Sequence, residues 1–599
     1  MPRIEDYALI GDLQTAALVS REGSIDWCCF PRFDSPACFA ALLGDARHGR
    51  WLLAPKGKLK RATRRYRSDT LILESIYQTE EGTVRAIDFM PPRGEAPDIV
   101  RIVEGLDGRV SMRSELVIRF DFGHIVPWVR RADHSRVAIA GPDALCFRTP
   151  VEVRGENMTT VSEFTLGAGE RVPFVLTWFP SHRDLPDEID PEQALDDAED
   201  YWLDWAGICT HGGDYHDEIH ESLLVLKALT YAPTGGIVAA PTTSLPEFVA
   251  GVRNWDYRFC WLRDATLTLL AMLNAGYTEE AEAWRTWLLR AVAGDPSDLQ
   301  IMYGIAGERR LDEREIEWLP GYEGSRPVRV GNAASEQLQL DVYGEVVDAL
   351  YQARAHGVPA DDHVWSLTRK LLTWLEDGWH KEDSGIWEVR GDPRHFTHSK
   401  LMAWVAFDRA CRYHTEFGRK GPFERWQALR DEVHAEIHEK AWNDDKQAFT
   451  QSYETDELDA SVLLMPLVGF CSATDERFVS TVEAIQRELT YDGLVLRYRT
   501  HETDDGLPPG EGVFLPCSFW LADVLALQGK TEPARELFER LLDLRNDVGL
   551  LAEELDPVSG RQLGNFPQAF THLALVNTAL VLGEGRGMRH PPERDRTLL

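Results

Sequence analysis

The stretch 383–400, DSGIWEVRGDPRHFTHSK, is a long connection between two expected helices, 362–379 and 398–416. It is one of six long connections in the second part of the chain, and they alternate with short ones such as Gly276-Tyr277 and Lys530. Successive connections in a run of antiparallel helices lie at opposite ends. The alternation therefore predicts that all six long connections lie on one face.

Twelve helices are expected in this part of the chain because apolar residues recur at helical spacing. The segments are 216–231, 261–275, 278–293, 333–356, 362–379, 398–416, 424–441, 457–468, 472–488, 515–529, 531–547 and 568–583. Helix pairs repeated in this way bury their apolar faces either by closing into a ring or by stacking into an open array. We expect a closed double ring, the (α/α)6 barrel, with an open solenoid as the alternative. Long loops on one face favour a lined pocket at one end of the barrel.

The first part of the chain is expected to be β structure. Runs rich in branched and aromatic residues are separated by turn residues, and the expected strands include 71–77, 84–89, 116–122 and 174–179. An antiparallel β-sandwich is preferred to a barrel only on general frequency. Asp190-Pro191 is typical of a helix start and opens a linker. We expect a sandwich at 1–188, a linker at 189–214, a catalytic barrel at 215–585 and a polar tail at 586–599.

Charge and composition narrow the function classes. The 98 acidic and 64 basic residues give a net charge of -34 over 599 residues, which argues against nucleic acid or an anionic membrane as partner. The sequence contains neither an apolar run of membrane length nor a recognisable signal peptide, so we expect a cytoplasmic protein. Nothing in the sequence fixes the oligomeric state.

The cysteines and histidines do not predict a metal site. The chain has 9 cysteines, an odd number, and no CxxC pair, so buried free thiols are expected. Two HxxxH pairs, His216/His220 and His434/His438, have helical spacing but lack the HExxH pattern and a third ligand. We interpret both pairs as helix surface and expect no metal.

Glu388 is the candidate general acid. It directly follows Trp387 in the stretch quoted above. A carboxyl group beside an apolar ring loses solvation, which raises its pKa and lets it deliver a proton near neutral pH. Taken alone, Glu388 is more often an ordinary solvated loop charge. The other long connections favour the catalytic interpretation.

The other long connections carry aromatic rings beside charged groups. Rings pack against the C–H face of a sugar, and Arg and Asp bind its hydroxyls. The first connection includes NWDYRFCWLRD and the last includes LLAEELDPVSG. The residues expected to line a sugar site are Tyr257, Trp261, Arg263, Asp264, Trp318, Trp387, Arg497 and the adjacent carboxylates Glu553 and Glu554.

Two carboxylates from loops on one face are what hydrolysis of a glycosidic bond requires, one as proton donor and one to activate water. The sequence has no phosphate loop, nucleophile elbow or dinucleotide fingerprint. The residues therefore favour an enzyme acting on a small carbohydrate. A noncatalytic sugar-binding protein and a phosphorylase on a similar barrel are the alternatives.

At these residues the chain resembles glycoside hydrolase family 15, the glucoamylase and trehalase family. NWDYRFCWLRD is similar to the family segment N-x-D-Y-x-x-x-W-x-R-D, GIWEV to D-L-W-E-E of the fungal enzymes, and AEELD to their S-E-Q-x-D. The opening IEDYALIGDLQTAALVSREGSIDW resembles that of prokaryotic members, which carry an N-terminal β-sandwich. The resemblance implies that Glu388 is the acid, Glu553 the base, and Arg263 and Asp264 the grip on the first glucose.

The resemblance also implies inversion at the anomeric carbon, with the two carboxyls roughly 6.5 to 9.5 Å apart, and no cofactor. Val389 and Arg390 depart from the second glutamate of the fungal motif, so contacts to the leaving sugar should differ. We expect no starch-binding module after the last helix. Together these features favour α,α-trehalose as substrate, with maltose or isomalto-oligosaccharides as the alternative.

Overall fold

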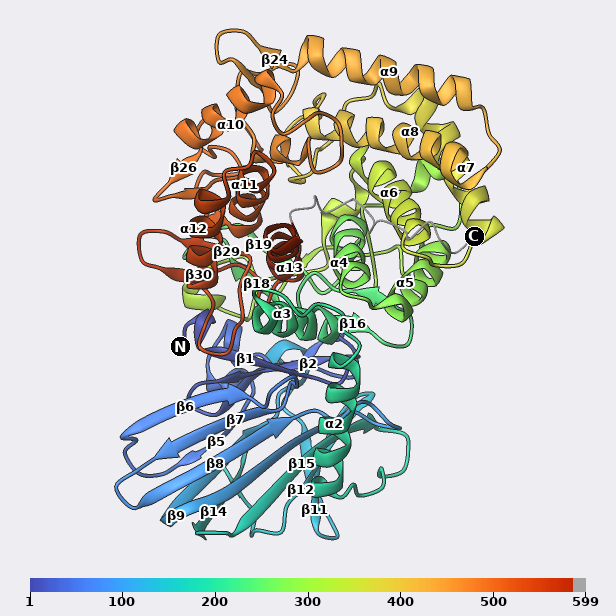
Figure 1. The fold of residues 1–599 in the computed structure, drawn as a ribbon. Helices are drawn as coiled ribbons and strands as arrows, with labels where there is room; N and C mark the ends of the chain where they lie inside the picture. The colour runs from blue at the N-terminus through green and yellow to red at the C-terminus, as the bar shows by residue number, and fades with distance from the viewer. Residues whose placement is uncertain (585–599) are drawn as a thin grey trace.

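The computed structural model describes residues 1–584, so the tail expected at 586–599 lies outside the described residues. The chain forms a sheet-rich N-terminal part and a helical C-terminal part, which pack against each other (Figure 1). No helix among residues 1–584 is both long and apolar enough to cross a membrane.

Fifteen strands build the N-terminal part. They are β1 (Tyr7–Gly11), β2 (Ala16–Ser20), β3 (Ser24–Cys29), β4 (Ala37–Phe39), β5 (Arg50–Pro55), β6 (Arg61–Tyr66), β7 (Leu73–Gln78), β8 (Gly82–Phe89), β9 (Asp98–Val117), β10 (Trp128–Ala132), β11 (Ser135–Ala140), β12 (Asp143–Arg148), β13 (Arg154–Glu156), β14 (Thr159–Gly167) and β15 (Arg171–Pro180).

The long strand β9 joins two groups of strands. Its first half pairs antiparallel with β8 and β15, and its second half pairs with β5 and β14. The strand expected at 116–122 is wrong, because β9 ends at Val117 and Phe120–Gly123 forms the short turn α1. Asp121 and Phe122 have positive φ values of 49° and 54° there, which an extended strand does not allow.

The helix α2 (Pro191–Ala206) begins where the sequence predicts. The Asp190 side chain accepts hydrogen bonds from the backbone of Glu192 and Gln193, and Pro191 occupies the first turn, where its missing N–H costs nothing. Trp202 and Trp205 on this helix are buried. α2 lies along the sheet and leads the chain into the helical part (Figure 1).

The helical part contains α3 (His216–Ala228), α4 (Leu262–Asn274), α5 (Thr278–Ala291), α6 (Asp341–Ala355), α7 (Asp362–Gly378), α8 (Thr397–Phe417), α9 (Phe423–Lys440), α10 (Glu476–Glu488), α11 (Leu515–Leu527), α12 (Thr531–Leu542) and α13 (Ala569–Glu584). The helix expected at 457–468 is instead the short 3₁₀ segment η7 (Ala460–Leu464). Pro466 follows it and has no N–H to continue an α-helical ladder.

The contacts between helices run in a circuit. α4 packs on α6, α6 on α8, α8 against η7, η7 against α11, α11 on α13, and α13 again on α4. These segments are buried on nearly every side, whereas α7, α10 and α12 bury only one face. The segments of the circuit are therefore more enclosed than α7, α10 and α12.

The sheet-rich part supports the long connections of the helical part. The Trp27 indole N–H donates to the Pro241 carbonyl at 2.8 Å. Arg258, which is buried, binds both oxygens of Asp256 at 2.9 and 2.7 Å and donates to the Ser35 carbonyl at 2.8 Å. The N-terminal part therefore fixes the backbone on either side of Tyr257.

Candidate active site

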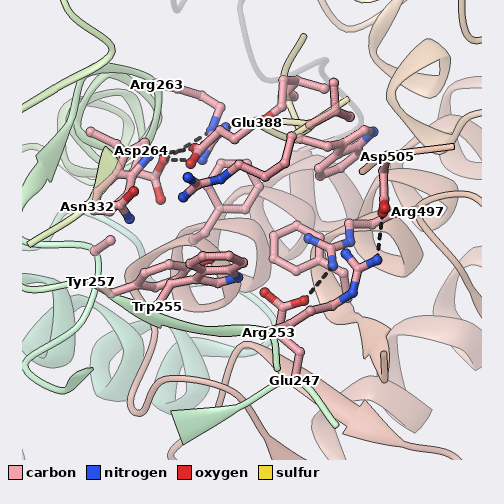
Figure 2. A pocket seen from close by; sticks show the side chains of 18 of the residues that line it. Glu247, Arg253, Trp255, Tyr257, Arg263, Asp264, Asn332, Glu388, Arg497 and Asp505 are labelled. Atoms are coloured by element: carbon pink, nitrogen blue, oxygen red, sulfur yellow. Dashed lines mark hydrogen bonds and ion pairs between the residues drawn. The ribbon is translucent and has the colours of Figure 1, made fainter. Parts of the chain in front are cut away.

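A cavity opens among the long connections between the helices. The space among its lining residues is about 760 Å³, and this volume includes open solvent at the mouth. Figure 2 shows Arg263, Asp264 and Glu388 together on one side and Arg253, Arg497 and Asp505 on the other. Seven of the residues expected from the sequence line it: Tyr257, Trp261, Arg263, Asp264, Trp387, Glu388 and Arg497.

Glu388 lies in the wall of this cavity, on the connection between α7 and α8. Its φ of +57° turns the backbone sharply after Trp387. The Trp261 indole N–H donates to Oε1 of Glu388 at 2.6 Å, and Arg263 lies 3.8 Å from the same oxygen. Burial raises the pKa of Glu388, while Arg263 and the Trp261 hydrogen bond oppose the rise. The carboxyl can therefore hold and deliver a proton.

Arg263 and Asp264 form the ion pair at the start of α4. Nε and Nη2 of Arg263 lie 3.0 and 2.9 Å from Oδ2 of Asp264, and Nη1 donates to the Ile386 carbonyl at 2.7 Å. The guanidinium also stacks over Phe570, 5.2 Å from the ring centroid. Arg263 and Asp264 therefore form an ion pair at the start of α4 and at the same time line the cavity.

Glu553 lies behind the cavity wall. It is fully buried, and Tyr257, which does line the cavity, donates its hydroxyl to Oε1 at 2.5 Å. The Asn565 backbone N–H donates to Oε2 at 3.1 Å. Burial, with the nearby charge of Glu247, raises the pKa of Glu553, and the Tyr257 hydrogen bond counteracts this rise. The neighbouring backbone at Gly564 leaves no room for a side chain, since a Cβ would lie 2.5 Å from Oε2.

One short segment connects the two carboxylates. Tyr257 bonds to Glu553 and Trp261, four residues later, bonds to Glu388. The two rings lie 5.2 Å apart between centroids. The relative placement of the two carboxylates is therefore set by the NWDYRFCWLRD segment itself.

Arg497 stands at the centre of a buried carboxylate cluster. Its Nη2 lies 3.1 Å from Glu247, 2.6 Å from Glu511 and 3.1 Å from Glu554. These three carboxylates have the spacing of metal ligands, but the guanidinium already supplies a positive charge among them. Glu554 is fully buried, does not line the cavity and accepts a hydrogen bond from the Gly512 N–H at 2.7 Å. Its position corrects the sequence prediction, because Glu554 contacts Arg497 and not the cavity.

Asp505 joins three connections, a role that the sequence did not indicate. Its carboxylate binds Arg253 at 2.7 Å and accepts from the Tyr498 hydroxyl at 2.8 Å. Its carbonyl accepts from the Arg390 N–H at 2.8 Å. Arg253, Glu247 and Asp505 were missed because each stands in a loop without a recognisable motif.

Comparison with known proteins places the chain in a family. Residues 213–580 match the family model described as glycosyl hydrolases family 15. The chain belongs to this family. Residues 1–193 match a second model, described as trehalase-like, N-terminal. The protein is therefore a glycoside hydrolase, as the three motif segments indicated.

Relatives agree with this assignment, and a solved structure shares the fold. A protein named trehalase from Mycobacterium tuberculosis is 38% identical, over 97% of this chain and 89% of its own length. One from Thermoplasma volcanium with the same name is 33% identical, over 97% and 94%. A bacterial glucoamylase complexed with acarbose shares the fold with a TM-score of 0.72 at 12% identity, covering 98% of this chain and 95% of that one.

Trp318 does not line the cavity of this glycoside hydrolase, contrary to the sequence prediction. Its indole N–H donates to the Phe122 carbonyl at 3.0 Å, and its ring stacks on His124 with centroids 4.3 Å apart. Both partners belong to the N-terminal part. Trp318 therefore packs between the two parts of the chain, a contact that a single sequence does not reveal.

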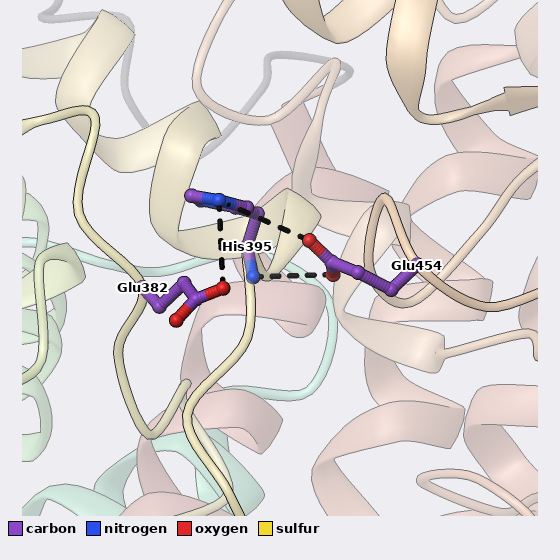
Figure 3. A group of neighbouring side chains, drawn as sticks. All are labelled: Glu382, His395 and Glu454. Carbon is purple, nitrogen blue, oxygen red and sulfur yellow. Dashed lines mark hydrogen bonds and ion pairs between the residues drawn. The ribbon is translucent and has the colours of Figure 1, made fainter.

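Outside the cavity, Glu382, His395 and Glu454 form a cluster that holds the connection carrying Glu388 in place. His395 Nε2 lies 3.8 Å from Glu382 and 3.9 Å from Glu454, and the His395 N–H donates to Glu454 at 3.3 Å (Figure 3). Glu382 and Glu454 are exposed. The cluster links both ends of the connection to the next long loop.

Proposed function

We propose that this family 15 enzyme is an inverting, exo-acting α-glucosidase that hydrolyses α,α-trehalose to two molecules of glucose. The observation that carries the proposal is the pair of hydrogen bonds from one segment, Trp261 to Glu388 and Tyr257 to Glu553. The choice of trehalose is supported by relatives named trehalase that cover nearly the whole chain.

Glu388 acts as the general acid in this proposal. It gives its proton to the oxygen between the two glucose units as the bond from that oxygen to the first anomeric carbon breaks. Burial favours the protonated form of Glu388 before the reaction. Trp261 then stabilises the carboxylate that is left, because its N–H donates to Oε1.

Glu553 acts as the general base. It takes a proton from a water molecule whose oxygen attacks the first anomeric carbon from the face opposite the leaving sugar. The new C–O bond gives β-glucose, and the second glucose leaves with its own anomeric configuration unchanged. Tyr257 and the Asn565 N–H hold the carboxylate of Glu553 in place. This chemistry uses neither a metal nor an organic cofactor.

Arg263 and Asp264 are proposed to bind the hydroxyls of the first glucose, with Trp261, Trp387, Tyr257 and Arg497 around it. Asp264 is held by Arg263 and faces the cavity from the start of α4. Charged donors and acceptors in fixed positions recognise a pattern of hydroxyls better than neutral groups do.

We also infer the finer architecture. The two groups of strands that share β9 suit an antiparallel β-sandwich at 1–188, and the circuit of packed helices suits an (α/α)6 barrel at 215–585, with 189–214 as linker. Cysteines that form no disulfide among residues 1–584 favour a cytoplasmic location.

The test is a substrate panel. The purified enzyme is incubated with trehalose, maltose and isomaltose, with and without inorganic phosphate, and kcat/KM is measured for each sugar. The proposal predicts the highest kcat/KM for trehalose and no dependence of product on phosphate. A preference for maltose or isomaltose, or phosphate-dependent release of glucose 1-phosphate, would contradict it.

A further inference from the structure

Arg390 lies where the sequence departs from the fungal motif, two residues after Glu388. Its guanidinium Cζ lies 4.8 Å from the centroid of the Trp255 ring, and Nη2 donates to Glu313 at 3.3 Å. Both Arg390 and Trp255 line the cavity. The connection that carries Glu388 therefore also places the positively charged Arg390 side chain in the cavity wall.

Most N–H donors of the Arg390 guanidinium have no acceptor among the described residues. A guanidinium carries five N–H donors, and within residues 1–584 Glu313 is the one group that accepts a hydrogen bond from this side chain. The side chain keeps 25% of its surface exposed. Free donors of this kind at a cavity wall can bind two neighbouring hydroxyls of a sugar at once.

A second arginine, Arg329, also stacks on the Trp255 ring, but its guanidinium donates to backbone carbonyls. Arg329 has its Cζ 4.5 Å from the Trp255 centroid and also lies near Glu313, at 3.6 Å. Its Nη1 donates to the carbonyls of Val252 and Asn254 at 2.8 and 3.1 Å, and it does not line the cavity. Arg329 therefore supports Trp255 and the backbone, while Arg390 is the one that faces a ligand.

Residues on either side of Glu388 in this connection contact different groups of the cavity wall. Two residues before it, the Ile386 carbonyl accepts from Arg263 at 2.7 Å. Two residues after it, the Arg390 N–H donates to the Asp505 carbonyl at 2.8 Å. If Arg263 and Asp264 bind the first glucose, as proposed above, and Glu388 protonates the oxygen between the two sugars, the leaving sugar would lie on the Arg390 side of Glu388.

The backbone around Arg390 is fixed by close packing. Gly506 has φ of +79°, and a Cβ at this position would lie 2.5 Å from the Arg390 carbonyl carbon. Asp505, next to it, is itself held by Arg253 and Tyr498. The guanidinium is thus presented from a rigid support, as a site that must distinguish hydroxyl patterns requires.

We propose that Arg390, stacked on Trp255, binds the hydroxyls of the leaving glucose and so gives the enzyme its preference for a disaccharide whose second ring carries a full set of hydroxyls. This inference rests on the proposed function. Stacking on the Trp255 ring holds the Arg390 guanidinium in place, and its fork offers donors for the hydroxyls of that glucose.

The experiment compares two substrates in two matched variants. Trehalose has a second glucose, whereas methyl α-glucoside has the same first glucose and a methanol leaving group that also needs a proton from Glu388. In Arg390→Met, kcat/KM for trehalose should fall about 10- to 100-fold, the loss of a charged hydrogen bond, while kcat/KM for methyl α-glucoside should change by less than about 3-fold. Arg329→Met, which touches the same ring and the same glutamate, should leave the ratio between the two substrates unchanged.

The outcomes distinguish a failure of the Arg390 inference from a failure of the proposed function. A similar loss on both substrates in Arg390→Met would mean a structural effect and would overturn the inference, as would an unchanged kcat/KM for trehalose. A change of ratio in Arg329→Met equal to that in Arg390→Met would also overturn it. If the unaltered enzyme hydrolyses methyl α-glucoside but not trehalose, the proposed function fails, and that result is visible before any variant is made.

Discussion

The Tyr257 hydroxyl donates a hydrogen bond of 2.5 Å to Oε1 of Glu553. This contact joins a residue of the cavity wall to a carboxylate that is fully buried behind it. The hydrogen bond lowers the pKa of Glu553 against the effect of burial. A base with a lower pKa is ready to accept a proton over a wider range of pH.

Replacing Tyr257 by phenylalanine should therefore weaken the base. Loss of the hydrogen bond raises the pKa of Glu553, so the acidic limb of the kcat/KM profile should move to higher pH, and kcat should fall about 10- to 100-fold. Tyr351→Phe is the matched control, because Tyr351 also donates to a carboxylate, Glu416 at 2.9 Å, but does not line the cavity. An unmoved acidic limb in Tyr257→Phe would contradict this role.

Removing the charge of Glu247 should move the same limb the other way. Glu247 raises the pKa of Glu553 through its negative charge. In Glu247→Gln the base loses its proton more readily, so the acidic limb should shift to lower pH. The profile is measured from kcat/KM for trehalose between about pH 5 and 8, where most proteins are most stable. A shift to higher pH would show that another group sets this limb.

The acid and its leaving group can be tested together. Glu388→Gln should reduce kcat for trehalose about 10²- to 10⁴-fold, the usual contribution of a general acid. The loss should be much smaller for α-glucosyl fluoride, because fluoride leaves without first receiving a proton. Glu382→Gln, on the same connection but outside the cavity, should keep nearly full activity on both. Equal losses on the two substrates would rule out proton donation by Glu388.

The contact between the two parts of the chain depends on Arg258. Arg258 and Asp256 are both buried and form an ion pair, and Arg258 also donates a hydrogen bond to the Ser35 carbonyl of the N-terminal part. Arg258→Met leaves Asp256 buried without its cation and should lower the free energy of unfolding by about 3–5 kcal/mol, as measured by urea denaturation.

Two further variants check the origin of that effect. Arg32→Met removes a partly exposed arginine that binds Asp34 and Glu308, and it should cost no more than about 1 kcal/mol. Adding Asp256→Asn to Arg258→Met should recover part of the loss, because the unpaired charge is then gone. No recovery in the double variant would show that packing, and not the charge, accounts for the loss.

The sequence predicted those features that depend on local pattern. Helical spacing gave eleven of the twelve expected helices as α-helices. Adjacent aromatic and charged residues predicted a sugar site at Glu388, Arg263 and Asp264, and all three line the cavity. The family motif distinguished Glu553 from Glu554, and this choice stays a prediction, because both carboxylates contact residues of the cavity wall: Glu553 contacts Tyr257 and Glu554 contacts Arg497.

The errors concern features that depend on distant partners. Trp318 is an aromatic residue in a long connection, but its ring packs on His124 of the other part of the chain. Asp505 and Glu247 gain their importance from arginines in other connections. The 3₁₀ turn at η7 and the turn after β9 were missed because an apolar run does not reveal where its backbone changes direction.

The most direct test of the account is the anomeric form of the glucose first released from trehalose, followed by proton NMR before mutarotation. Attack by water opposite Glu388 inverts one anomeric carbon and leaves the other unchanged. The account predicts that β-glucose and α-glucose appear in equal amounts from the first spectrum. Release of α-glucose alone would mean retention, and it would contradict the assignment of Glu388 and Glu553 as acid and base of an inverting enzyme.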